Sequence, residues 1–204
     1  MISRVLFSLA VAAALACSVV DAQVPDHPVG HVHELLSPAV LPGESLYQLP
    51  VVLDTADGRH AELASLAGMP VVVAMFYSSC TTVCPMLTLQ MQHLELALDP
   101  AARSRVKFVL ISLDSERDTP AKLAEFAAEH HLDTSRWLIG HAAPADVRAV
   151  AAALGVRYRQ LPDKSFSHSA LITLLNSAGV PVARTQTLAG DDPAFLAALR
   201  ALLP

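Results

Sequence analysis

Apolar residues occur along the chain in two alternating patterns. Residues 71–77 form a continuous apolar run, and residues 106–112 form a second, largely apolar run. Runs of this length predict strands that are buried on both faces of a sheet. Between them, apolar residues from 87 to 98 recur at spacings of three and four, which predicts one buried face of a helix. The pattern therefore indicates a strand, a helix and a second strand.

Turn residues divide the rest of the chain into further elements of the same alternating order. Alternating strands and helices that end on an antiparallel hairpin and a helix predict an α/β fold. The expected architecture is a thioredoxin-like sandwich with an N-terminal β-hairpin and an extra hairpin insertion. The predicted elements are a hairpin at 51–60, helices at 63–67, 119–131 and 144–154, strands at 137–139, 156–159, 171–175 and 180–183, and a last helix opened by Asp191-Asp192-Pro193.

The N-terminus is typical of an export signal. A positive charge at Arg4 precedes an apolar stretch at residues 5–16, and Val20 and Ala22 are the small residues that a signal peptidase prefers before its cleavage site. We therefore predict a signal peptide at residues 1–22.

A flexible leader is then expected at residues 23–45, followed by the folded domain at 46–204. Two alternatives to cleavage after residue 22 remain. Cys17 could be the acylated N-terminus of a lipoprotein, or residues 5–20 could form an uncleaved anchor about 24 Å long. All three interpretations place the domain in the periplasm or elsewhere outside the cytoplasm, with or without an N-terminal membrane anchor.

Composition limits the number of domains and the classes of partner. With 204 residues, 53% of them hydrophobic and 16% charged, the chain can bury one core but is too short for two domains. A net charge of −5 without a run of Lys or Arg provides no electrostatic footprint for nucleic acid. We expect a monomer that does not bind nucleic acid.

Cys80 and Cys84 are the cysteines of the predicted domain, and they lie where a buried strand gives way to a helix. Free N–H groups and the helix dipole favour thiolates at that position. The spacing allows a disulfide bond, a redox pair or two ligands to one ion. Because two soft thiolates favour Cu(I) or zinc and leave a metal site incomplete, we expect a third ligand from elsewhere, most simply a histidine.

Nine histidines are candidates for that ligand. His168 is preferred for its position, since in a thioredoxin-like fold the loop that enters the strand at 171–175 faces the cysteine loop. Three histidines in the leader could capture copper, although a proline-bearing linker needs no ligands. Besides His168, the candidates are His27, His31, His33, His60, His93, His130, His131 and His141.

Three motifs resemble those of the Sco/SenC family of copper proteins: Cys80-x-x-x-Cys84-Pro85, Ser112-Leu113-Asp114-Ser115-Glu116-Arg117-Asp118-Thr119-Pro120, and His168-Ser169-Ala170. The resemblance covers residues 46–204. It implies a thioredoxin-like domain in which Cys80, Cys84 and His168 bind one copper ion, as Cu(I) or also as Cu(II).

The same resemblance implies a metallochaperone, a binding protein rather than an enzyme. Such a protein delivers copper to the binuclear copper centre of cytochrome c oxidase or maintains the thiols of that centre. The expected partners are an oxidase subunit or another periplasmic copper protein that accepts copper, and a thiol reductant protein.

The chain departs from the family pattern at two positions. Ser115 replaces a proline, and Ser167 replaces an acid before the histidine, which removes a carboxylate that could orient the imidazole. Asp114 either lies under the copper-binding loop, where it would orient the ligands without binding the ion, or hydrogen-bonds a turn. Glu116 and Arg117 are expected to pair with each other on the surface.

Three other residues have explanations that need no metal. Asp118 precedes Thr119-Pro120 and is accounted for by capping of the next helix. Met86 and Met91 are expected in the core rather than as copper ligands, because they lie in the predicted helix.

The alternative function is a thiol–disulfide reductase that acts on the cysteines of a copper-site protein, with Cys80 and Cys84 as its redox pair. Two features disfavour it: Ala170 stands where thioredoxins place a proline, and CxxC is the more usual redox spacing. A peroxidase of the peroxiredoxin type is disfavoured too, since Val73 and Tyr77 occupy the positions of its Pro and its Thr or Ser.

Overall fold

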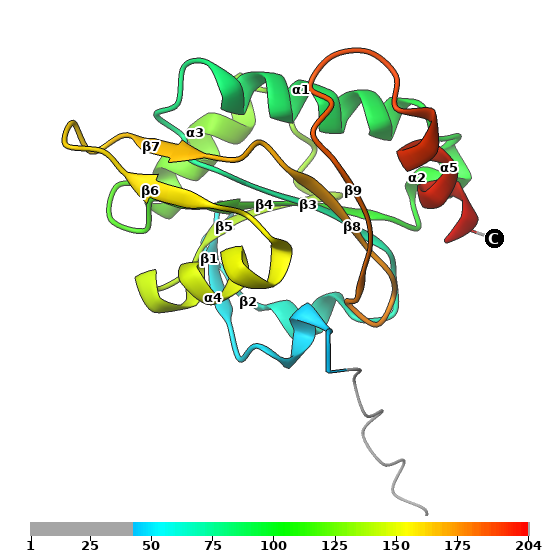
Figure 1. Ribbon diagram of the computed structural model, residues 1–204, viewed down its shortest axis with the longest axis horizontal. Coiled ribbons are helices and arrows are strands. Elements are labelled where there is room, and N and C mark those ends of the chain that lie inside the picture. Colours follow the sequence, from blue (N-terminus) through cyan, green and yellow to red (C-terminus); the bar gives the residue numbers. More distant parts are fainter. Residues whose placement is uncertain (1–42, 204) are drawn as a thin grey trace, which may run out of the picture. The chain divides into compact units, whose positions relative to one another are not determined.

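A seven-stranded mixed sheet forms the centre of the protein in the computed structural model, which describes residues 43–203 (Figure 1). The strands are β1 (Val52–Thr55), β2 (His60–Glu62), β3 (Val71–Phe76), β4 (Lys107–Ser112), β5 (Trp137–His141), β8 (Ile172–Leu175) and β9 (Pro181–Thr185). They lie in the order β2-β1-β5-β4-β3-β8-β9. β3, β4 and β5 are parallel, whereas β1 and β8 are antiparallel to their neighbours β5 and β3.

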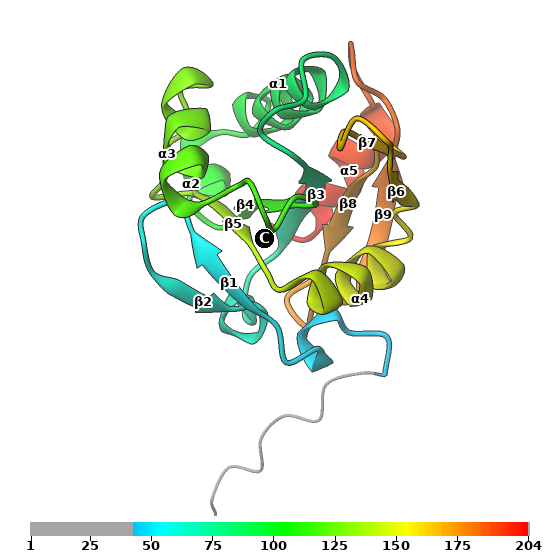
Figure 2. The ribbon, with the colours of Figure 1, turned by 90° about the vertical axis from the view of Figure 1, so that its left-hand side faces the viewer.

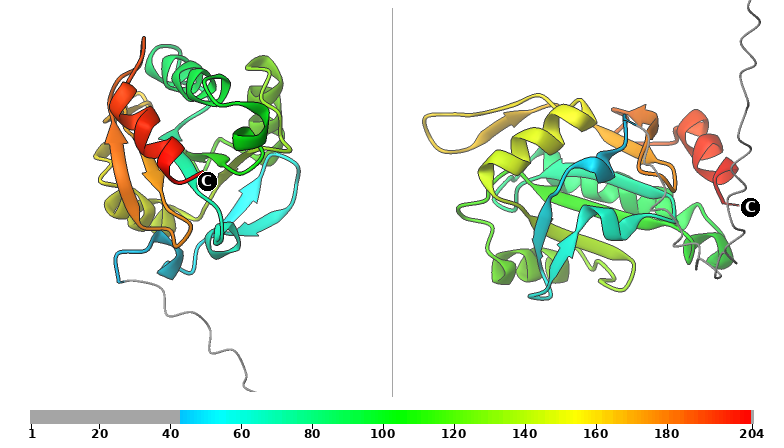
Figure 3. Two further views of the ribbon diagram at one scale, coloured as in Figure 1. Left: turned by 90° about the vertical axis from the view of Figure 1, so that its right-hand side faces the viewer. Right: turned by 90° about the horizontal axis from the view of Figure 1, so that it is seen from below.

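Helices cover both faces of this sheet, as the end-on view in Figure 2 shows. α1 (Val83–Leu96), α3 (Pro120–Glu129) and α5 (Pro193–Ala201) pack on one face. α4 (Pro144–Leu154) and the short helices η1 (Leu46–Gln48) and η2 (Leu63–Leu66) pack on the other. Figure 3 shows this second face from below, and the short helix α2 (Pro100–Arg103) follows α1.

Strand β3 lies between the two cores. All six of its residues are buried, and because side chains alternate along a strand they are divided between the two faces. Its even-numbered residues, Phe76 among them, belong to the core under α1, α3 and α5. Its odd-numbered residues, Met75 among them, belong to the core under α4. The predicted strand buried on both faces is confirmed.

Glu95 fixes the C-terminal end of α1 to the sheet. The residue is 7% exposed. It accepts a hydrogen bond from Arg136 Nε at 2.6 Å and another from Trp137 Nε1 at 2.8 Å. Both carboxylate oxygens of a buried charge are thereby satisfied, as burial requires. The opposite end of the helix, which carries the cysteines, is held by other contacts.

The predicted strand at residues 156–159 does not join the main sheet. Instead β6 (Tyr158–Gln160) pairs only with β7 (Phe166–His168), as a separate two-stranded hairpin. Its polar residues are the physical reason: Arg159 and Gln160 are exposed, and a central strand would have to bury both faces. The extra hairpin insertion is therefore present, but β7 was not predicted.

The remaining predicted elements are found within a few residues of their expected bounds. α2 and η1 had no sequence prediction. The signal peptide, Cys17 and the leader histidines His27, His31 and His33 lie outside the described residues. Within residues 43–203, no helix is both long and apolar enough to cross a membrane.

The two edge strands are short or polar. β2 has three residues, and its His60 and Glu62 are exposed. β9 begins with Pro181, which has no N–H to donate to a sheet, and carries Arg184 in its middle.

Candidate metal centre

Cys80 and Cys84 lie in the connection from β3 to α1. Cys84 is the second residue of α1 and is completely buried, whereas Cys80 precedes the helix and is partly exposed. The N–H group of Cys84 points to the Sγ atom of Cys80 at 3.5 Å. Both residues are free thiols. The expected placement at a strand-to-helix turn is confirmed.

His168 faces this connection from the hairpin. It is the last residue of β7 and pairs with Tyr158 on β6. Its Nε2 atom lies 3.6 Å from the Sγ atom of Cys84. Its ring also lies edge-on to the ring of Tyr77, with centroids 6.0 Å apart. The sequence predicts a loop at His168, but the residue lies at the end of a strand because β7 pairs with β6.

A backbone carbonyl determines which nitrogen of His168 carries the proton. Nδ1 lies 3.1 Å from the carbonyl oxygen of Ser169. Because a carbonyl can only accept, Nδ1 must donate, and in the neutral ring Nε2 then holds a free lone pair. Burial lowers the pKa of His168, outweighing the opposing effect of this hydrogen bond. A neutral imidazole therefore directs its lone pair at Cys84, as a metal ligand requires.

Cys80 is the more acidic of the two thiols. Burial opposes its ionisation, but hydrogen bonds to its sulfur outweigh burial and lower its pKa to about 7. The donors are the N–H groups of Cys84 and Thr82, the Cys84 thiol and the Tyr77 hydroxyl. Free N–H groups at a helix N-terminus stabilise a thiolate in this way. At neutral pH a large fraction of Cys80 is ionised.

Cys84 has the opposite character. Burial raises its pKa well above the usual range, and the neighbouring Cys80 and Asp118 raise it further. The thiol proton can be donated to the Nε2 lone pair of His168. The pair therefore consists of an accessible thiolate and a buried thiol, and a cation that bound both sulfurs would displace the proton of Cys84.

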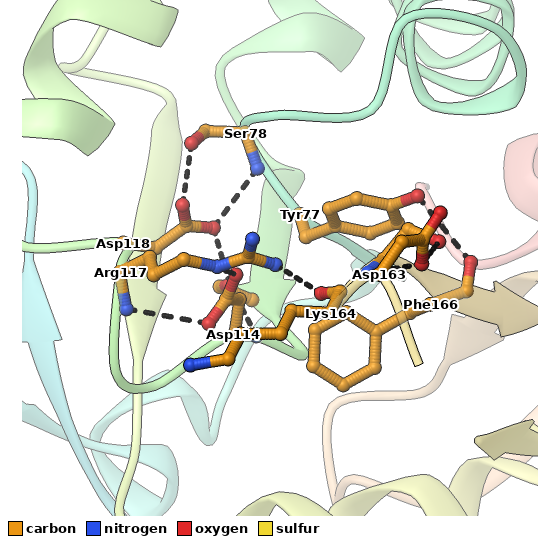
Figure 4. Close-up of polar contacts among 10 residues, drawn as sticks. Tyr77, Ser78, Asp114, Arg117, Asp118, Asp163, Lys164 and Phe166 are labelled. Carbon is orange, nitrogen blue, oxygen red and sulfur yellow. Dashed lines mark hydrogen bonds and ion pairs between the residues drawn. The ribbon is translucent and has the colours of Figure 1, made fainter. Parts of the chain in front are cut away.

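Asp118 holds the start of the cysteine loop (Figure 4). It is 1% exposed. Its carboxylate accepts from the Ser78 N–H at 2.9 Å, from the Ser112 hydroxyl at 2.5 Å, and from the Ser78 hydroxyl. Thr119, not Asp118, caps α3. Sequence reasoning explained Asp118 by capping and so missed its link to the loop.

Asp114 hydrogen-bonds a turn, the second of its two predicted roles, because its carboxylate accepts from the Arg117 N–H at 3.2 Å. It is buried, and its carboxylate pairs with Arg117, whose guanidinium also donates to the Lys164 carbonyl (Figure 4). Arg117 therefore pairs with Asp114 and not with Glu116, which corrects the predicted surface pair. Asp114 joins the β4–α3 loop to the hairpin that carries His168, while Asp118 supports the cysteines.

The other described histidines lie away from the cysteines. His60 and His141 both face Asp54, at 2.5 and 3.8 Å. His93 pairs with Asp191. His130 packs on the ring of Phe126, and His131 follows α3 with a positive φ. None of them shares the position of His168.

The two methionines of α1 differ from each other. Met91 is completely buried, as predicted, but Met86 is 45% exposed, which contradicts its predicted place in the core. The reason is helical spacing. Met86 lies beside the buried stripe that runs through Cys84, Leu87 and Met91 and does not belong to it.

The three predicted ligands do not form a closed site as they stand. Among residues 43–203, no group of three or more Cys, His, Asp or Glu side chains is arranged to hold a metal ion. The structure brings Cys84 and His168 into contact and Cys80 next to Cys84.

The mixed sheet with helices on both faces and a thiol pair at the β3–α1 turn define a thioredoxin-like α/β protein that also carries the β6–β7 hairpin. The family model "SCO1/SenC" matches residues 42–203. The chain therefore belongs to the SCO1/SenC family.

Individual relatives agree with this assignment. A Bacillus subtilis (strain 168) "SCO1 protein homolog" is 32% identical over 88 residues, which is 43% of this chain and 45% of that protein. The copper-bound structure of Bradyrhizobium japonicum ScoI is 25% identical, with a TM-score of 0.64 over 76% of this chain and 98% of that one.

A second solved structure is that of BsSco, which is described as a member of the Sco family of cytochrome c oxidase assembly proteins that has a disulfide switch. It is 20% identical, with a TM-score of 0.64 over 76% of this chain and 92% of that chain. At this identity the likeness supports the shared fold.

Proposed function

We propose that this protein is an exported copper carrier that holds one Cu(I) ion on Cys80, Cys84 and His168. We further propose that it supplies the copper centre of cytochrome c oxidase during assembly. The contact between Cys84 Sγ and His168 Nε2, at 3.6 Å, carries the proposal. It joins a buried sulfur to an imidazole whose Nε2 lone pair is free.

The donor set fits Cu(I) chemically. Two sulfurs and one neutral nitrogen are soft or borderline ligands, which select Cu(I) over hard cations. Cys80 supplies a thiolate near neutral pH because its pKa is about 7. Cys84 loses its proton when the ion binds, so loading releases protons and depends on pH.

Anaerobic Cu(I) titration of the reduced protein against a competing chelator tests the ligand assignment. We expect one ion per molecule, lost in Cys80→Ala and in Cys84→Ala. His168→Ala should weaken binding but leave the two thiolates. His93→Ala is the matched control, because His93 pairs with Asp191 away from the cysteines. Equal affinity of His168→Ala and the wild type would contradict the assignment.

A thiol–disulfide reductase is the second candidate, and the unequal thiols favour it. In such an enzyme the Cys80 thiolate would attack a substrate disulfide, and Cys84 would then displace the mixed disulfide. The two thiols would lose two electrons and two protons to the substrate, which becomes a dithiol.

The reductase candidate can be tested separately from copper binding. The reduced protein is mixed with the oxidised, copper-free copper-binding domain of the oxidase, and thiols are counted on both proteins by mass spectrometry. Stoichiometric thiol transfer supports the reductase. Copper binding without thiol transfer supports the carrier.

A further inference from the structure

The exposed hydrophobic residues of the protein are concentrated on α1. Of the five large hydrophobic residues exposed among residues 43–203, three lie on this helix: Met86 at 45%, Leu89 at 59% and Leu96 at 68%. Their spacings of three and seven place them on one side of the helix. Single exposed apolar residues are ordinary, but a row on one helix is typical of an interaction surface.

The sequence places no charged residue on α1 near Met86 and Leu89, whereas His93, which contacts Asp191, lies between Leu89 and Leu96. Residues 63–94 contain no Asp, Glu, Lys or Arg, although they include the cysteine loop and most of α1. A helix face that meets only water normally carries charged residues. Met86 is two positions from Cys84, so the uncharged surface begins at the proposed copper ligands.

The hairpin on the other side of the cysteine loop is positively charged. Arg157 and Arg159 are exposed, and neither guanidinium has an acidic partner among the described residues. They line a shallow groove together with Tyr158, Ser167, His168 and Ser169. Residues 147–190 contain five Arg or Lys and one acid, although the whole chain has a charge of −5.

The N-terminal end of α1 and the hairpin lie at one end of the molecule. Figure 1 shows β6 and β7 at the end towards which β3 runs, and Figure 2, seen from that end, shows α1 beside the hairpin. The contact between Cys84 and His168 joins them directly. An apolar patch and a cationic patch therefore flank the cysteine loop.

We propose that Met86, Leu89, Arg157 and Arg159 form the docking face for a protein that accepts copper, and that this partner presents an apolar centre with an acidic rim. The proposal rests on the proposed copper-carrier function. Interfaces commonly combine an apolar, Met-rich centre with a polar rim. Opposite charges at the rim raise the rate of encounter. Other surfaces of the described chain do not combine these features next to the thiols.

Docking would place the acceptor's ligands against the copper ion. Bonds from Cu(I) to the acceptor form as its bonds to Cys80, Cys84 and His168 break, and the copper stays Cu(I). The protons that leave the acceptor's ligands are taken up by the released cysteines, so the exchange is balanced. No oxidant or reductant is consumed in this exchange.

The test measures copper transfer from the loaded protein to the copper-free, soluble copper-binding domain of the oxidase from the same organism. The apolar variant is Met86→Ser with Leu89→Ser, and the charge variant is Arg157→Glu with Arg159→Glu. Val182→Ser, at an equally exposed valine of β9, and Arg105→Glu, near the opposite end of the sheet, are the matched controls.

We expect both docking-face variants to transfer copper about ten-fold more slowly than the wild type, with the controls unchanged. Added salt should slow the wild type but not the charge variant. Transfer to a small chelator should be the same for all variants. Equal transfer rates for the docking-face variants and the controls would overturn the proposal, as would the absence of any transfer to the domain.

A second measurement separates this proposal from the proposed function. The complex of the two copper-free proteins is followed by NMR chemical-shift changes on α1 and the hairpin. If chelator competition shows no Cu(I) binding but the complex forms through this face, the copper function fails and the docking face stands. If Cu(I) binds normally but no shifts occur at these residues, the docking face fails alone.

Discussion

The Sγ atom of Cys84 and the Nε2 atom of His168 lie 3.6 Å apart, although 84 positions separate the two residues in the chain. Cys84 is fixed by the first turn of α1, and His168 by its pairing with Tyr158 on the hairpin. Neither α1 nor the hairpin belongs to the main sheet, so the distance between Cys84 and His168 depends on the contacts that attach the hairpin and the helix to that sheet.

Asp118→Asn should destabilise the protein by about 2 kcal/mol, because a buried carboxylate that accepts three hydrogen bonds is replaced by an amide that must also bury two donors. Chemical denaturation measures the change. Asp163→Asn is the control, since this exposed carboxylate accepts from the N–H and hydroxyl of Ser165 in the same way. Equal loss of stability in the two variants would contradict a special role for Asp118.

Alkylation of Cys80 by iodoacetamide should rise with pH to half its maximum rate near pH 7, because its pKa is about 7 and only the thiolate reacts. Below pH 6 the rate should fall about ten-fold for each unit of pH. Mass spectrometry of the copper-free, reduced protein follows the reaction. Cys80→Ser is the control for the site of labelling, and a midpoint near pH 9 would refute the prediction.

Tyr77→Phe should move that alkylation midpoint to higher pH. The Tyr77 hydroxyl helps to lower the pKa of Cys80, and it also lies 3.3 Å from the carbonyl oxygen of Phe166. Since a hydroxyl has one proton, the Cys80 sulfur and the Phe166 carbonyl share it. Removal of the hydroxyl therefore makes the Cys80 thiolate less stable and raises the pKa of Cys80. Tyr158→Phe leaves this interaction in place and should leave the midpoint unchanged. The same midpoint in both variants would show that the hydroxyl is not involved.

Gly179→Ala should cost about 3 kcal/mol, from a left-handed backbone together with a steric clash. Its φ is +78°, and an added Cβ would lie 2.5 Å from Cδ2 of Tyr47. Gly58 has a φ of +77° with nothing within 4 Å, so Gly58→Ala should cost only about 1 kcal/mol. Thermal unfolding of both variants isolates the contact with Tyr47, and equal losses would argue against it.

Most of the main sheet could be predicted because its strands are apolar runs bounded by turn residues. β7 could not be predicted, because Phe166-Ser167-His168 is too short to show an alternation of apolar and polar residues. Its strand conformation is stabilised by pairing with β6. Met86 was predictable in retrospect, because it falls outside the spacing that begins at Leu87. Local pattern therefore finds elements that bury a face, and it fails for those that depend on a partner strand.

The candidate site was predictable only in part for a similar reason. Cys80 and Cys84 stand out by their spacing, and His168 was preferred among nine histidines for its position before the strand at 171–175 and then by resemblance to a family. Which of the two carboxylates, Asp114 or Asp118, supports the cysteine loop depends on a turn in which the Asp118 N–H donates to the Asp114 carbonyl. That turn aims one carboxylate at Ser78 and the other at Arg117, which spacing alone does not reveal.

The edges of the main sheet bear on how the protein behaves at high concentration. An edge strand with free N–H and C=O groups can pair with a second molecule and begin an aggregate. Here β2 offers only three residues and exposed polar side chains, and β9 opens with a proline and carries an arginine. Both edges are thus poor templates for strand addition, whichever state the cysteines and the copper are in.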